Sequence, residues 1–154
     1  MSASQPLRVR AGRSGDVEDL LALEANFPGD RMSRRSLRHL LSAPTARVWV
    51  IAQQRQVVAA AIVLLRRGSY YGRIYSVVVA PQCRGRGLAR QLLRYAERDA
   101  RSLKLRGLSL EVRVDNTAAR TLYRDLGYVE TQVLEHYYED GCDGVRLRRE
   151  FATD

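Results

Sequence analysis

A glycine-rich turn, Arg84–Ala89, carries the residue types best suited to chemistry, and it directly precedes a long amphipathic segment. Where a strand passes into a helix, the first backbone N–H groups lack partners and the helix dipole favours an anion. Gly85 and Gly87 let the backbone approach a phosphate closely, and Ala89 keeps the first helical turn narrow. We therefore predict that Ile74–Ala100 forms a strand, a phosphate-binding turn and a helix, as in an enzyme that uses a phosphate-bearing cofactor.

The alternative is a turn that binds nothing, because Gly-x-Gly before a helix occurs in many loops. The surrounding pattern favours binding. The uninterrupted Val77–Val79 is typical of a central strand buried on both faces, Pro81 breaks the strand, and a second strand and helix follow the long helix. The whole constellation, and not the glycines alone, predicts the phosphate site.

A second stretch with candidate chemistry follows the long helix. Glu111 lies in an otherwise apolar strand, where a carboxylate is unfavourable unless it faces a cleft or is paired. Arg113 shares its face, so a pair with Arg113 or with Arg120 is the structural alternative. Tyr123 on a helix stripe could belong to the core, and Asn116 could be an ordinary helix cap.

A short strand and two helices are expected at the start of the chain. Leu7–Arg10 alternates apolar and polar residues, and Asp16 is placed to cap a helix with leucines on one face. Glu24 falls on that apolar face, so its carboxylate is expected to reach solvent or a cleft. Ser33 can cap a second helix, which ends before Pro44.

The remaining pattern predicts six more strands and one more short helix, the latter capped by Asp115 or Asn116 and closed by Gly127. The resulting order is strand, two helices, three strands, helix, strand, helix and two strands. This is a mixed α/β layer architecture and not a Rossmann order. The six strands are expected at Arg47–Gln53, Val57–Arg66, Tyr71–Ala80, Gly107–Val114, Tyr128–Tyr138 and Gly144–Phe151.

Composition limits the class of protein. The chain has 154 residues, 45% hydrophobic and 28% charged, which predicts one globular domain spanning residues 1–154. No apolar run is long enough to cross a bilayer, and the two distant cysteines match no metal-site spacing. We therefore expect a cytoplasmic, metal-free protein that does not bind membranes and is a monomer or a homodimer.

The formal net charge of +9 has two possible interpretations. It could attract anions such as nucleotide phosphates, acidic peptides or ribosome-like surfaces, or it could be a solvated basic exterior. The arginines are spread along the chain and are not interleaved with aromatic residues, so no direct nucleic-acid contact is expected.

The glycine-rich turn resembles the acetyl-CoA loop of the GNAT superfamily of N-acetyltransferases. That loop reads Arg or Gln, two residues, Gly, one residue, then Gly or Ala, and Arg84, Gly87 and Ala89 match it. The superfamily usually has a proline three residues before the first position, as Pro81 precedes Arg84. A second register that starts two residues earlier also fits the letters but lacks this proline.

The resemblance covers nearly the whole chain and implies an α/β fold (α+β mixed sheet). In this GNAT fold a central, mostly antiparallel sheet of six to seven strands is flanked by about four helices. The strand before the loop splays from its neighbour and pairs through its backbone with the pantetheine arm of acetyl-CoA. The positions that correspond to this cofactor site are Val77, Val78, Val79, Arg84, Gly85, Arg86, Gly87, Leu88, Ala89 and Arg90.

The second stretch is similar to the RimI-like subgroup, the ribosomal-protein alanine N-acetyltransferases, in its Leu-Glu-Val-Arg strand, Asn-x-x-Ala helix start and Leu-Tyr pair. Amine acetylation needs a deprotonated nitrogen and a protonated or stabilised leaving thiolate. The resemblance assigns Glu111 as general base, Tyr123 as the acid that protonates the CoA sulfur, and Asn116 as a cofactor contact.

The acceptor side matches the subgroup only in part. RimI-like proteins usually carry Phe-Pro-Trp in the loop between the first two helices, whereas this chain has Phe27-Pro28-Gly29. Tyr137 and Tyr138, followed by Asp140-Gly141, resemble the turn with which these enzymes close over a peptide N-terminus. End-of-strand packing is the alternative for both tyrosines. We predict that Phe27, Pro28, Tyr137 and Tyr138 bind the acceptor.

Three functions remain open from the sequence. The first is acetyl-CoA-dependent acetylation of a protein or peptide α-amino group by direct transfer in a ternary complex. The second is acetylation of a small amine, such as a polyamine, an amino acid or an antibiotic. The third is a basic RNA- or ribosome-associated module without catalysis, against which Glu111 and Tyr123 argue, as does the lack of an aromatic run for base stacking.

Overall fold

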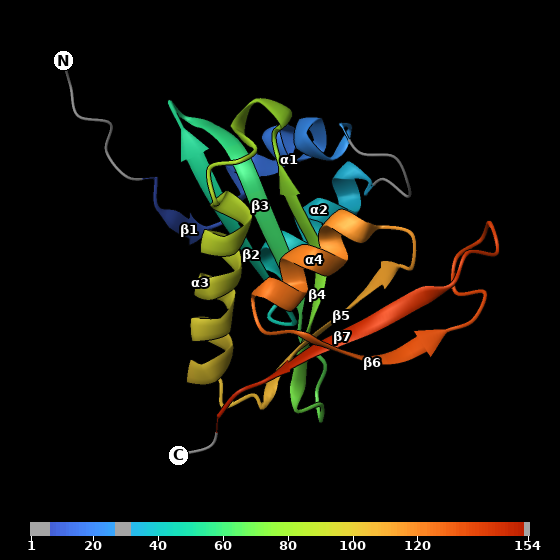
Figure 1. Ribbon diagram of the computed structural model, residues 1–154. Helices are drawn as coiled ribbons and strands as arrows, with labels where there is room; N and C mark the ends of the chain where they lie inside the picture. Colours follow the sequence, from blue (N-terminus) through green and yellow to red (C-terminus); the bar gives the residue numbers. More distant parts are fainter. Residues whose placement is uncertain (1–6, 27–31, 153–154) are drawn as a thin grey trace.

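A seven-stranded sheet forms the centre of the structure, a computed structural model that describes residues 7–26 and 32–152 (Figure 1). The strands lie in the order β1-β2-β3-β4-β5-β7-β6. β4 and β5 are parallel, and the other neighbouring strands are antiparallel. The mixed, mostly antiparallel sheet predicted from the sequence is confirmed.

The described elements follow the expected order, with short 3-10 turns at Ser14–Asp16 and Pro81–Cys83. They are β1 (Val9–Ala11), α1 (Val17–Glu24), α2 (Arg34–Ser42), β2 (Ala46–Gln53), β3 (Gln56–Leu64), β4 (Tyr71–Val79), α3 (Leu88–Ser102), β5 (Gly107–Arg113), α4 (Thr117–Asp125), β6 (Val129–Leu134) and β7 (Gly144–Glu150). In the part of the chain that these elements cover, no helix is both long and apolar enough to cross a membrane.

The helix ends show which capping predictions were right. The Ser36 N–H donates to Ser33 Oγ over 3.0 Å at the start of α2, and Gly127, with φ of 96°, follows α4 as expected. The prediction for Asp16 was wrong in detail. Its carboxylate does not cap α1 but pairs with Arg10 and accepts the Arg13 N–H over 2.7 Å, which holds the preceding turn.

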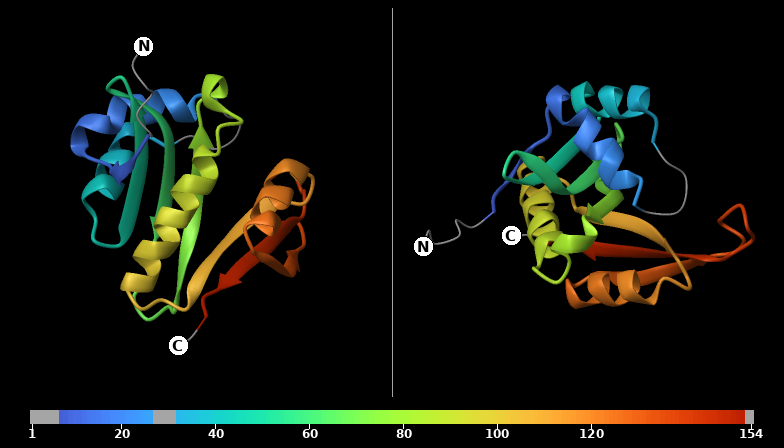
Figure 2. Two further views of the ribbon diagram at one scale, coloured as in Figure 1. Left: turned by 60° about the vertical axis from the view of Figure 1, so that its left-hand side comes forward. Right: turned by 90° about the horizontal axis from the view of Figure 1, so that it is seen from above.

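Helices cover both faces of the sheet. Figure 2 shows α1 and α2 on one face and α3 and α4 on the other. The apolar residues of α3 recur at three- and four-residue steps, so they form one stripe that packs on the sheet. The buried residues of this stripe are Leu88, Leu92, Leu93, Ala96 and Ala100.

A bulge in β4 decides which side chains share the α1/α2 face. Ser76 pairs with Ile62 and Ile74 with Val63, so Tyr75 is an extra residue between the two pairs. Ile74 packs with α3, and Ser76 therefore points to the opposite face. Arg73, next to Ile74 on the other side, also points to the α1/α2 face. The bulge thus brings Arg73 and Ser76 to one face of the sheet.

Two strand predictions need correction. β6 ends at Leu134 and not at Tyr138, because the chain turns at His136, whose φ is 51°. Val77 and Val79 are only half-buried, whereas Val78 is 8% exposed. The run is apolar on both faces, but it lies where β4 has left its neighbour β5, so it is not fully enclosed.

Candidate active site

The turn between β4 and α3 has the backbone geometry of an anion site. Gly85 and Gly87 have φ angles of 80° and 75°, in the left-handed region that favours glycine. A Cβ added to either residue would meet nothing within 4 Å, so backbone conformation, and not crowding within the chain, requires glycine. Gly87 is the N-cap of α3 and supplies no side chain to the first-turn N–H groups.

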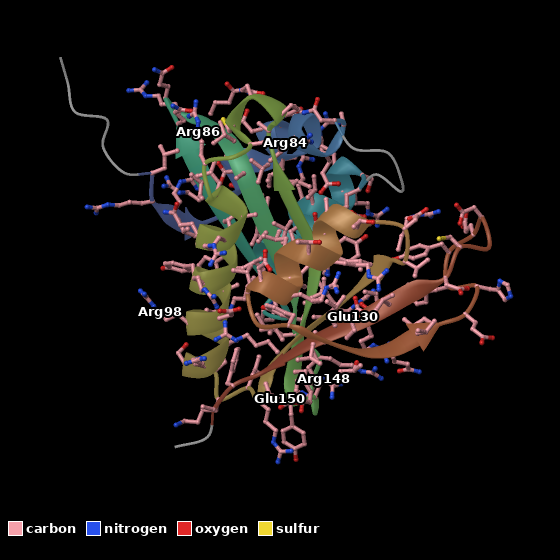
Figure 3. All side chains as sticks on the ribbon, viewed as in Figure 1. Arg84, Arg86, Arg98, Glu130, Arg148 and Glu150 are labelled. Atoms are coloured by element: carbon pink, nitrogen blue, oxygen red, sulfur yellow. The ribbon has the colours of Figure 1, made fainter. Side chains whose placement is uncertain are left out.

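The side chains around this turn are of two kinds, exposed arginines and a buried leucine. Arg84, Arg86 and Arg90 are exposed, and Figure 3 shows Arg84 and Arg86 on the turn itself. Leu88 is 5% exposed and packs in the core, so it can meet a cofactor only through its backbone. An exposed basic turn with glycines at positive φ at a helix N-terminus fits the pyrophosphate of acetyl-CoA.

β4 and β5 separate beside this turn. They pair only where Tyr71–Arg73 lies against Gly107–Ser109, although β4 continues to Val79 and β5 to Arg113. The two strands diverge in Figure 2, and the sheet splits there into two halves. The backbone of Val77–Val79 on its β5 side is therefore beyond the paired segment, as the resemblance implied for the strand that holds pantetheine.

Glu111 lies in the middle of β5 on the α1/α2 face of the sheet. Its side chain is 9% exposed, and each carboxylate oxygen meets a guanidinium. Arg73 Nε donates to Oε2 over 3.0 Å, and Arg146 Nη2 donates to Oε1 over 3.4 Å. Arg146 is also the cross-strand partner of Glu111 in β7. Two ion pairs from neighbouring strands hold this carboxylate in a fixed orientation.

The pairing alternatives considered from the sequence were wrong. Arg113 shares the face of Glu111 but pairs with Asp115 and Asp140, which lie farther along the chain. Arg120 pairs with Glu130 over 2.9 Å. Sequence reasoning missed Arg73 because its contact with Glu111 depends on the β4/β5 register and on the bulge, neither of which has a local signal.

Tyr123 approaches from the other face of the sheet. It is 6% exposed, packs in the cluster that holds the apolar residues of β5, and meets the Tyr128 ring edge-on with centroids 5.4 Å apart. Burial raises the pKa of its phenol well above the ordinary tyrosine range. Within the described part of the chain its hydroxyl makes no hydrogen bond, so a proton there is available to a bound group.

Asn116 is the N-cap of α4. Its Oδ1 accepts the Ala119 N–H over 3.1 Å, which confirms the capping alternative. A contact between Asn116 and the cofactor stays a prediction.

The connection between β6 and β7 brings Tyr137 to Arg73. Arg73 Nη2 donates to the Tyr137 hydroxyl over 3.4 Å, so one guanidinium joins Tyr137 to Glu111. The rings of Tyr137 and Tyr138 meet edge-on with centroids 5.0 Å apart, and Tyr137 is 44% exposed. Phe27 and Pro28 lie outside the described residues.

A second carboxylate lies on the same face. Glu24 ends α1, and its Oε1 accepts the Ser76 hydroxyl of β4 over 3.2 Å. Burial raises the pKa of Glu24, while the Ser76 hydrogen bond lowers it to a smaller extent. The sequence pointed to a cleft or solvent for Glu24 but assigned it no role.

A groove lies between α2, the end of β3 at Leu64 and the middle of β4 at Tyr75. Its lining combines polar and apolar side chains, among them Arg35, His39, Leu40, Leu64 and Tyr75. Leu64 is the cross-strand partner of Arg73, which places the groove on the face of Glu111.

The comparisons with known proteins agree with this geometry. The model of the acetyltransferase (GNAT) family matches residues 16–128. The chain belongs to the GNAT acetyltransferase family. Similar members include the N-alpha-acetyltransferase RimI of Mycobacterium tuberculosis, which is 37% identical over 78 residues, or 50% of this chain and 48% of that protein. The chain spans about half the length of several curated relatives that it matches.

Two further acetyltransferases match over most of their length. The N-terminal acetyltransferase A complex catalytic subunit ard1 of Schizosaccharomyces pombe is 28% identical over 151 residues, 92% of this chain and 85% of that protein. The crystal structure of the ribosomal-protein-S18-alanine N-acetyltransferase from Escherichia coli superposes with a TM-score of 0.85. At 21% identity, it covers 97% of this chain and 96% of that one and shows the shared fold. RimI-like relatives and the GNAT fold predicted from the sequence are thus confirmed.

Proposed function

We propose that this protein is an acetyl-CoA-dependent N-acetyltransferase that acts on the N-terminal α-amino group of a protein or peptide. The observation that carries the proposal is the position of Glu111 and Tyr123. They lie on opposite faces of β5, which separates from β4 beside a phosphate-type turn. Membership of the GNAT family and the N-terminal acetyltransferases among its relatives support the reaction class.

Acetyl-CoA fits the residues present on the donor side. The backbone of Gly85–Leu88 and the side chains of Arg84, Arg86 and Arg90 would hold its phosphates, and Val77–Val79 would pair with the pantetheine arm. Bound there, it supplies an acetyl group activated as a thioester.

The chain's own residues then handle the protons. Glu111 takes a proton from the acceptor's ammonium nitrogen, directly or through water, so that the nitrogen has a lone pair for attack. Arg73 and Arg146 keep its carboxylate aimed from β5 while this happens. Tyr123 would hold a proton at its phenol oxygen for the sulfur that leaves, since a tyrosine phenol is neutral at physiological pH and burial raises its pKa further.

The open acceptor side favours a peptide over a small amine. Tyr137 is exposed beside Arg73, and the groove along α2 continues from the same face. A peptide that presents its amine to Glu111 could extend over this surface, whereas a small amine would leave the surface unused. A thiol-release assay with acetyl-CoA tests this. We expect saturation by short peptides with a free N-terminus and none by polyamines or free amino acids.

We also propose a domain organisation, a cellular location and an oligomeric state for the protein. Residues 1–154 form one catalytic domain, supported by the continuous sheet of the described residues. The protein acts in the cytoplasm, as expected from its composition, and as a monomer or homodimer. Size-exclusion chromatography with light scattering and fractionation of the producing cells test them.

A further inference from the structure

Glu24 is held in an environment that does not compensate its charge. The residue is half-buried, and among residues 7–26 and 32–152 its one hydrogen-bond partner is the neutral Ser76 hydroxyl, with no ion pair. It is also the last residue of α1, where the helix dipole is negative and disfavours a carboxylate. A half-buried carboxylate without a cation is unfavourable unless a cation arrives from elsewhere.

The position of Glu24 relates it to the candidate active site. The β4 bulge points Ser76 to the same face as Arg73, which contacts Glu111. Arg73 and Ser76 are three residues apart, which is about 7–10 Å along the strand. Ser76 also directly precedes Val77, the first residue of the segment proposed to pair with pantetheine. Glu24 therefore lies near both the base and the donor strand.

Two carboxylates of this face thus differ in their partners. Both oxygens of Glu111 already bind guanidinium groups from Arg73 and Arg146. Glu24 has only a hydroxyl partner among the described residues. An incoming ammonium group gains more from the uncompensated carboxylate than from the one that two arginines neutralise.

We propose that Glu24 binds the acceptor's ammonium group and, oriented by Ser76, places it for deprotonation at Glu111. This inference rests on the proposed function and assigns the substrate-binding residue of the same site. The ligand class it implies is a primary amine that arrives protonated. Glu111 remains the proton acceptor, and Glu24 changes no bond.

The test compares two peptides and three variants by calorimetry in the presence of CoA. The probes are a hexapeptide with N-terminal alanine and its desamino analogue, which lacks only the α-amino group. Wild-type protein is expected to prefer the amino peptide by about 10-fold or more. Glu24→Gln should remove that preference, and Glu24→Asp should restore part of it. Glu18→Gln, an exposed position on the same helix that pairs with Arg34, should keep the preference.

Thermal unfolding separates binding from a structural role. Glutamine keeps the hydrogen bond to Ser76 and removes a half-buried charge, so Glu24→Gln should leave Tm unchanged or raise it. The proposal is overturned if wild-type protein binds both peptides equally, or if Glu24→Gln retains the preference. Absence of acetyl transfer by wild-type protein to any amine would instead refute the proposed function, because the binding preference is measured without turnover.

Discussion

The donor side and the acceptor side of this site are built in different ways. The proposed donor side, Val77–Arg90, is one continuous stretch that would bind the cofactor mainly through backbone N–H and C=O groups. On the proposed acceptor side, side-chain contacts join Arg73, Glu111 and Tyr137 from three separate segments, and Glu24 of α1 contacts Ser76 of β4 on the same face. A backbone site depends on local conformation, whereas a side-chain site depends on how distant elements pack. Variants should therefore separate cofactor binding from acceptor chemistry.

The largest expected effect is on the donor side. Gly87→Glu forces a side chain into a φ of 75° and places a negative charge at the N-terminal turn of α3. We expect acetyl-CoA binding to fall below detection by calorimetry. Gly68→Glu is the matched control, because Gly68 has a φ of 84° in a turn outside the site and similar open space. If Gly87→Glu binds acetyl-CoA as Gly68→Glu does, the turn does not hold the phosphates.

The next largest effect is expected when the proposed general acid, Tyr123, is replaced. Tyr123→Phe keeps the ring packing and removes the phenol, so kcat should fall about 100-fold while acetyl-CoA affinity stays within about 2-fold. Tyr128→Phe is the control, because its hydroxyl donates to the buried Glu97 over 2.9 Å and has no role in transfer. It should lower Tm without a comparable loss of kcat. Unchanged turnover in Tyr123→Phe would remove this residue from the mechanism.

The pH dependence of turnover gives a second check on Tyr123. The phenol must be protonated to act, and burial raises its pKa above the ordinary value of about 10. Turnover by the wild-type protein should therefore not decline on the alkaline side until the pH exceeds that value. A decline that begins near pH 8 to 9, roughly a unit or more below the ordinary tyrosine range, and that persists in Tyr123→Phe would assign the acid to another group.

A smaller effect is expected where the acceptor side orients its base. Arg73→Met removes one ion pair of Glu111 and the contact with Tyr137, so kcat/KM for the peptide should fall about 10-fold. Arg113→Met is the control, since Arg113 shares the face of Glu111 but pairs with Asp115 and Asp140. Its kcat/KM should stay within about 2-fold. Equal losses in both variants would point to general surface charge and not to orientation of Glu111.

The smallest effect on activity is expected outside both sides of the site. Asp16→Asn should lower the free energy of unfolding by about 1–2 kcal/mol at pH 7 and leave kcat unchanged. Hydrogen bonds from Arg10 lower the pKa of Asp16, so its stabilisation is present above the unfolded value of about 4 and is lost as the pH falls through the folded value. Denaturant titrations at pH 7 and pH 3 should show the difference between variant and wild type shrinking on acidification. If the difference in unfolding free energy is the same at both pH values, the Arg10–Asp16 ion pair is not its source.

The sequence predicted the conformation of the β4–turn–α3 segment well because its signals are local. Glycines before an amphipathic segment report a turn at positive φ, and the strand and helix around them follow from periodicity. The same reasoning placed Glu111 and Tyr123 in the correct elements. It missed Arg73 and Arg146 as partners of Glu111, because those contacts depend on strand register.

The bulge at Tyr75 shows why the strand register could not be predicted from the sequence. One extra residue reverses the alternation of β4, so a period-two pattern puts Ser76 on the wrong face relative to Arg73. The contact between Glu24 and Ser76 therefore could not be derived from spacing. Tyr138 was expected within a strand because the turn residues that the sequence offers, Glu139-Asp140-Gly141, come only after it, although the chain turns already at His136.

The most direct test of the central claim is single-turnover acetyl transfer from acetyl-CoA to an alanine-terminated hexapeptide, followed by mass spectrometry, in wild-type protein and in Glu111→Gln. The account predicts one acetyl group on the peptide N-terminus with wild-type protein, and a transfer rate lower by about 100-fold in Glu111→Gln with acetyl-CoA affinity unchanged. Equal rates in the two proteins, or an acetyl group transferred only to polyamines or free amino acids, would contradict it.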